Sequence, residues 1–204
     1  MYTFIGGNMD RPFYLIVILF SLSLPVLSQD MTGRYEDNTS MSILGDDGNA
    51  RDCYRAAGIA ARIHYTSSRD LITCNLALTR SALSPRDRAA TLTNRGIIHI
   101  ALDHFDEAIT DLNGALELKP EFGEVHVNIG NIYFINDDYF SAIEEYTAAI
   151  NKKTTKVHVA HINRGMAYEK LGDVENAEKD YTIALELIPS ASLPRVRLDQ
   201  LLNN

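Results

Sequence analysis

A segment of similar sequence occurs three times in this chain. Its copies start at Asn94, Asn128 and Asn163, so they are separated by 34 and 35 residues. A sequence that returns at this period indicates a solenoid, because one unit cannot bury its own apolar face and must stack on its neighbours. The period therefore predicts an elongated stack of similar units.

Small residues at fixed places in each copy indicate how a unit packs. Each copy has one glycine, then two alanines with a large side chain between them. We predict two helices per unit, because the glycine and the first alanine leave room for close antiparallel approach while the large side chain fills the space beside them. In copy order, these positions are Gly96, Gly130 and Gly165; Ala108, Ala142 and Ala177; Leu112, Tyr146 and Tyr181; and Ala115, Ala149 and Ala184.

This combination resembles the tetratricopeptide repeat family, with Pro120 and Pro189 at the repeat ends and Thr154 departing from the pattern. The resemblance covers residues 86–189. It implies an all-α fold, a right-handed α-solenoid of helical hairpins, with repeats at 86–122, 123–157 and 158–191. We expect a degenerate pair of helices at 51–85 and a capping helix at 192–204, which makes nine helices over residues 50–204.

The N-terminal segment, residues 1–28, has the features of an export signal. Arg11 precedes an apolar run from Phe13 to Leu24, and cleavage is predicted after Ser28. The run is shorter than the roughly 20 apolar residues that span a bilayer, so we expect a membrane association only if the signal is not cleaved. Residues 29–49 are polar and acidic, and we expect a flexible leader there. A periplasmic or secreted location follows from this interpretation.

The chain has two cysteines, Cys53 and Cys74, one on each helix of the degenerate pair. Antiparallel packing of these helices would bring them towards one end of the hairpin. An exported protein meets an oxidising compartment, so we favour a disulfide between them. Two buried free thiols are the alternative.

No pattern of catalytic, metal-binding or cofactor-binding residues stands out. A net charge of −8 argues against nucleic acid as a partner. There is no glycine-rich phosphate loop and no serine nucleophile motif. His158 and His161 are three residues apart, but no further ligand completes a metal set. We interpret His126 and His161 as packing residues and Glu145 as part of a solvated face, and we expect no enzyme activity and no cofactor.

The three asparagines are the candidate binding residues. In proteins of the family that the chain resembles, the first helix of each repeat lines the concave surface, so Asn94, Asn128 and Asn163 would face a groove. A side-chain amide carries a donor and an acceptor, so it can pair both sides of a peptide group without reading its side chain. The alternative is that these asparagines cap or bridge helices within the array.

Residues around the asparagines are mainly apolar. They suggest a groove for a peptide or helix with apolar anchors, although packing within the array would also explain several of them. The candidates are Ile97, Asn131, Met166, Val127, Ile162 and Phe134.

Two functions remain open at this point. The first is an exported adaptor that binds a peptide or protein segment in its concave groove. The alternative is a structural or assembly subunit of an envelope complex, which acts by self-association, including as a homo-oligomer, or by stacking through its end helices.

Overall fold

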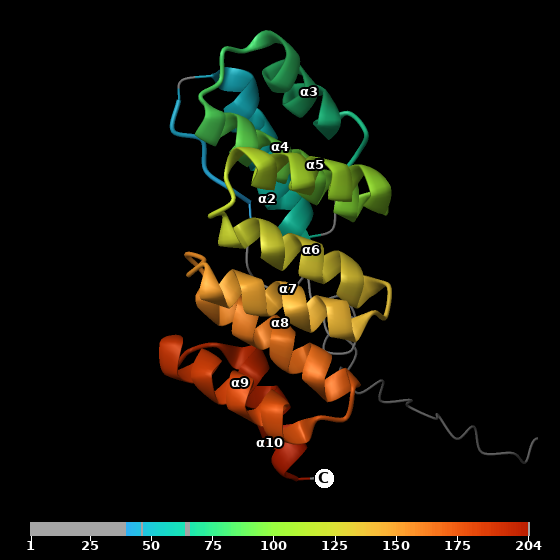
Figure 1. Ribbon diagram of the computed structural model, residues 1–204, viewed down its shortest axis with the longest axis vertical. Coiled ribbons are helices and arrows are strands. Elements are labelled where there is room, and N and C mark those ends of the chain that lie inside the picture. Colours follow the sequence, from blue (N-terminus) through green and yellow to red (C-terminus); the bar gives the residue numbers. More distant parts are fainter. Residues whose placement is uncertain (1–39, 46, 64–65, 204) are drawn as a thin grey trace, which may run out of the picture.

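The computed structural model describes residues 40–45, 47–63 and 66–203, and all regular structure in these ranges is helical (Figure 1). Among the described residues, no helix is long and apolar enough to cross a membrane. The helices are α2 (Gly48–Ile63), α3 (Asp70–Arg80), α4 (Pro85–Ala101), α5 (Phe105–Leu118), α6 (Gly123–Ile135), α7 (Tyr139–Asn151), α8 (Val157–Lys170), α9 (Val174–Leu187) and α10 (Ser192–Leu202).

The helices form a solenoid of hairpins. Successive helices pair as α2 with α3, α4 with α5, α6 with α7 and α8 with α9, and α10 packs on α9 at the C-terminal end. The first helices α2 and α4 also contact each other, as do α4 and α6, and α6 and α8, so they form one side of the stack. The predicted all-α solenoid and its nine helices over the described residues are confirmed.

The turns inside the last three hairpins repeat with the sequence. Asp103, Asp137 and Gly172 have positive φ values of 59°, 61° and 75°, and they lie at the same 34- and 35-residue steps. This left-handed conformation is open mainly to glycine, asparagine and aspartate. Asp138 and Asp173 then cap α7 and α9 by accepting a backbone N–H three residues later, which fixes where the second helix begins.

The repeat glycines lie against the large residues of the second helices. The ring of Tyr146 is fully buried, and a Cβ atom added at Gly130 would lie only 2.6 Å from it. The predicted close approach is therefore confirmed, and glycine is required by space rather than by a turn. The equivalent pairs are Gly96 with Leu112, at 3.1 Å, and Gly165 with Tyr181, at 2.8 Å.

The structure joins Cys53 of α2 and Cys74 of α3 in a disulfide, with their Cα atoms 4.8 Å apart. Both residues are fully buried, next to the buried Ala57 and Ala60. Small side chains fill the core between α2 and α3, so these helices bury little apolar area against each other. The disulfide compensates for this with a covalent link. In the chain-entropy model, closing a loop of 21 residues stabilises the fold by about 3 kcal/mol.

The structure describes only part of the N-terminal region for which we made predictions. The predicted signal at 1–28, its cleavage after Ser28 and residues 29–39 lie outside the described residues. The flexible leader predicted for 29–49 is wrong at its C-terminal end, because α2 starts at Gly48 and residues 40–45 lie along α4. The reason is that side chains of α4 satisfy the main-chain polar groups of this segment.

Candidate functional site

The site begins at Asn94, which is fully buried in α4. Its Oδ1 accepts a hydrogen bond from the N–H of Met41 at 2.8 Å, and its Nδ2 donates to the carbonyl oxygen of Met41, also at 2.8 Å. One side-chain amide thus pairs with both main-chain groups of a single residue, 53 positions away in the sequence. The amide of Asn94 therefore binds main-chain groups of the chain's own segment, and its contact with a separate peptide stays a prediction.

Two residues at the N-terminal end of α4 extend this contact. Asp87 Oδ1 accepts the N–H of Leu44 at 2.9 Å, and Arg86 Nη1 donates to the carbonyl oxygen of Ser42 at 2.9 Å. The Leu44 side chain is 71% exposed, so the hydrogen bonds hold the main chain and leave that side chain in solvent. Met41, at 9% exposure, supplies a buried apolar anchor.

The carboxylate of Asp87 is charged at neutral pH. Burial alone would raise the pKa of Asp87, but hydrogen bonds from the Leu44 N–H and the Ser84 hydroxyl, together with the Arg86 charge, lower it below its ordinary value. A charged acceptor makes the bond to Leu44 stronger than one between neutral groups. Sequence inspection missed both Arg86 and Asp87, because a serine followed three residues later by an acidic residue is already explained as a helix cap.

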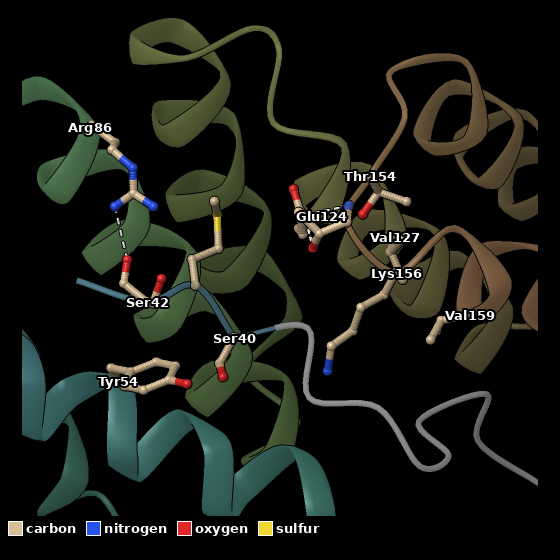
Figure 2. Close-up of a pocket in the computed structure, with 11 residues that line it drawn as sticks. Ser40, Ser42, Tyr54, Arg86, Glu124, Val127, Thr154, Lys156 and Val159 are labelled. Atoms are coloured by element: carbon tan, nitrogen blue, oxygen red, sulfur yellow. Dashed lines mark hydrogen bonds between the residues drawn. The ribbon is translucent and has the colours of Figure 1, made fainter. Parts of the chain in front are cut away.

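A cavity of about 220 Å³ lies beside the bound segment (Figure 2). Its walls come from residues 40–42, from Tyr54 of α2 and Arg86 of α4, and from Val127 of α6 and Val159 of α8. The groove therefore continues past the segment, across the first helices of three successive hairpins and onto a fourth. A ligand longer than the described segment has space here along the same face.

The third asparagine bridges two helices within the array, which is the alternative that we left open. Asn163 Nδ2 donates to Asn131 Oδ1 at 2.9 Å, which also accepts the Tyr146 hydroxyl at 2.8 Å. Asn163 therefore bridges α8 to α6 through its NH₂ group, while its buried Oδ1 has no hydrogen-bond partner among the described residues. Asn128 is 1% exposed on α6.

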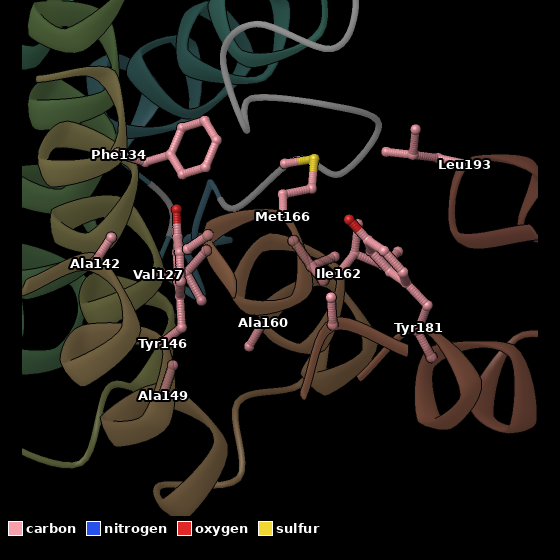
Figure 3. Packing of buried hydrophobic residues seen from close by; sticks show 14 residues of the cluster. Val127, Phe134, Ala142, Tyr146, Ala149, Ala160, Ile162, Met166, Tyr181 and Leu193 are labelled. Atoms are coloured by element: carbon pink, nitrogen blue, oxygen red, sulfur yellow. The ribbon is translucent and has the colours of Figure 1, made fainter. Parts of the chain in front are cut away.

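The apolar residues predicted to line the groove are all buried. Val127, Phe134, Ile162 and Met166 belong to one cluster that also contains Tyr146 (Figure 3). Ile97 lies in the cluster around the disulfide. Of these, Val127 also lines the cavity. For Phe134, Ile162, Met166 and Ile97, contact with a partner stays a prediction, because their packing explains them equally well.

Charged pairs join the two helices of the first and third repeats, α4 with α5 and α8 with α9, and sequence inspection missed them. Arg164 makes a two-point ion pair with Asp180, at 2.8 and 2.9 Å, and His161 Nδ1 lies 2.7 Å from the same carboxylate. Burial alone would raise the pKa of Asp180, but these hydrogen bonds and charges lower it. The available signal was an arginine directly before the repeat glycine, with an aspartate sixteen residues later, since Arg95 and Asp111 pair in the same way.

The histidines also differ from our interpretation. His126 Nδ1 lies 2.7 Å from Glu145, so both His126 and His161 contact a carboxylate of the second helix rather than serving only as packing residues. Glu145 is accordingly not on a purely solvated face, and its side chain is 28% exposed. In the described part of the chain, no group of three or more histidine, cysteine and acidic residues could hold a metal ion.

Comparison with known proteins identifies the repeats. The sequence profiles described as tetratricopeptide repeat match residues 89–122 and 158–190. These two segments of the chain are tetratricopeptide repeats. The chain is 33% identical over 70 residues to human tetratricopeptide repeat protein 6, which covers 34% of this chain and 14% of that protein. It is 23% identical over 118 residues to the lipoprotein NlpI homolog of Haemophilus influenzae, covering 58% and 37%.

Solved tetratricopeptide repeat structures show the same fold. The Arabidopsis OM64 TPR domain superposes with a TM-score of 0.55 at 19% identity, covering 59% of this chain and 98% of that domain. The first TPR domain of Spaghetti (RPAP3), bound to an HSP90 peptide, gives 0.55 at 24% identity, covering 58% and 93%. The chain spans only 14% and 37% of the two curated relatives, whereas it spans nearly the whole of these isolated domains.

Proposed function

We propose that the concave groove binds an extended segment of a partner protein and holds its main chain through buried side-chain amides. The observation that carries this proposal is the pair of hydrogen bonds between Asn94 and Met41. It supports main-chain recognition, because the amide pairs with groups that every residue except proline has. The cavity beside residues 40–42 provides space for a longer ligand on the same face.

A structural neighbour supports the proposal at the level of the fold. The first TPR domain of RPAP3 is described as bound to the peptide SRMEEVD of HSP90, so a domain of this architecture holds a short peptide. For this chain we propose a ligand with apolar anchors instead of an acidic one. The basis is the buried side chain of Met41, which occupies the place next to the amide.

The test is a selection of random twelve-residue peptides on a chain whose own segment is kept out of the groove. Met41→Pro and Leu44→Pro remove the two N–H groups that bind Asn94 and Asp87. We expect selected peptides to lose about tenfold or more in affinity when Asn94→Ala is added, because two buried hydrogen bonds are lost. The measurement is the dissociation constant by fluorescence anisotropy.

The matched control is Asn113→Ala, the same substitution at an exposed position of α5. It is expected to leave the affinity unchanged, and all variants must keep the parent's helicity. Selected peptides that bind the Asn94→Ala and Asn113→Ala chains equally well would place the binding surface elsewhere. Sedimentation over a range of concentrations, without peptide, separates groove binding from the alternative of self-assembly.

We also propose that the chain is exported. The apolar run from Phe13 to Leu24, the disulfide and the similarity to a lipoprotein homolog support this location. Expressed with its N-terminus in a bacterial host, the chain is expected in the periplasmic fraction, starting at Gln29 and with both cysteines resistant to alkylation. Val17→Arg should keep it in the cytoplasm with its N-terminus intact. Equal fractionation of the parent and Val17→Arg chains would argue against export.

A further inference from the structure

The segment that fills the groove is tied closely to the fold. Only Asp46 and Asp47 separate Gly45 from the start of α2. Asp47 Oδ1 accepts the N–H of Ala50 at 2.7 Å, and its Oδ2 accepts the Ser81 hydroxyl at 2.5 Å. Asp47 thus anchors the start of α2 to the α3–α4 connection without any contribution from the groove. Residues 40–45 are held next to their site at the high effective concentration of a short tether.

The contacts of this segment are of a kind that another chain can replace. The hydrogen bonds of the segment to Arg86, Asp87 and Asn94 use main-chain groups of residues 41, 42 and 44. Ser42 and Leu44 have exposed side chains, so they add little apolar burial. Any extended segment with an apolar residue in the place of Met41 can make the same contacts.

We propose that residues 40–45 are a tethered competitor, which occupies the Asn94 site until a partner segment displaces it. This inference rests on the proposed function of the groove. Since the tether ends at Asp47, whose bonds lie outside the groove, the segment can leave Asn94 and Asp87 while α2 stays capped. The apparent affinity for a partner is then reduced by the fraction of chains whose groove is filled.

The experiment needs no knowledge of the partner, because the chain supplies the probe. A fluorescently labelled peptide of residues 38–45 is titrated into two full-length variants. The first, Met41→Pro with Leu44→Pro, keeps extended backbone but has no N–H at either position. The second, Met41→Ala with Leu44→Ala, shortens the same two side chains but retains both N–H groups and is the matched control.

We expect the double-proline chain to bind the probe about tenfold or more tightly than the double-alanine chain, and we expect Asn94→Ala to abolish binding to the double-proline chain. Equal affinity for both variants, or no binding to either, would overturn the inference. Loss of helicity in the double-proline chain would also overturn it, because the segment would then be a fixed part of the fold. Failure of the proposed function would give a different result. The labelled peptide would then need Asn94 for binding, whereas no peptide selected from the library would.

Discussion

Replacing Gly130 by alanine is expected to lower the free energy of unfolding by about 3 kcal/mol, within the range for overpacked cores. The added Cβ would lie 2.6 Å from the Tyr146 ring, which is fully buried and whose hydroxyl donates to Asn131. The ring cannot move away without breaking that bond and disturbing the cluster around Phe134. Urea unfolding followed by circular dichroism measures the change.

Gly114→Ala is the control for this prediction. Gly114 also lies in a helix, but an added Cβ would meet only Leu92, at 3.6 Å, which is an ordinary contact. Alanine is the better helix former by about 1 kcal/mol, so this variant should be as stable as the parent or more stable. If Gly130→Ala and Gly114→Ala had the same effect, the repeat glycines would not be explained by close packing.

Replacing Asp180 by alanine is expected to cost about 3 kcal/mol. Asp180 is 2% exposed and accepts hydrogen bonds from Arg164, so its removal leaves a partly buried guanidinium without its counter-charge. Arg164 would keep its hydrogen bond to the Thr147 hydroxyl and the Tyr168 ring, whose centroid lies 5.9 Å away. The control is Glu178→Ala, an exposed acid on the same helix, which should change stability by less than about 0.5 kcal/mol.

The contribution of Asp180 should also depend on pH. Its pKa is lowered in the folded state, so its stabilising effect is fully present above the unfolded value near 3.8 and is lost as the pH falls through the folded value. The difference in stability between the parent and Asp180→Ala should therefore shrink as the pH falls below about 4. A difference that stayed constant down to pH 2 would show that the ion pair does not carry it.

The repeat units could be predicted from sequence because their packing depends on residue size. Gly130 and Tyr146 must fit each other, so their spacing in the sequence reports directly on the approach of two helices. The packing of the first hairpin was harder to predict from sequence. A step of 38 residues places Gly58 at the glycine position, but the structure leaves Gly58 partly exposed and buries Ala57 completely. The disulfide and the small residues around it determine the packing there, and neither follows the repeat pattern.

The bound segment could not have been found from residue types, because its main-chain groups form the hydrogen bonds. The pattern around Met41 resembles any polar linker, and Asp87 is already accounted for as part of a cap.

The asparagines show a second limit of prediction from sequence. Asn94 and Asn163 occupy the same place in their repeats, but Asn163 has Asn131 within reach on the neighbouring helix and pairs with it. Equivalent positions in different repeats therefore have different hydrogen-bond partners.

Main-chain recognition by Asn94 is tested most directly by N-methylating a selected peptide at one residue at a time. Affinities are measured on the double-proline chain and on the same chain with Asn94→Ala, as a double-mutant cycle. We expect one N-methyl position to weaken binding about tenfold or more when Asn94 is present and to have little effect when it is absent. If every N-methyl group had the same effect on both chains, the amide of Asn94 would not hold the main chain of the ligand.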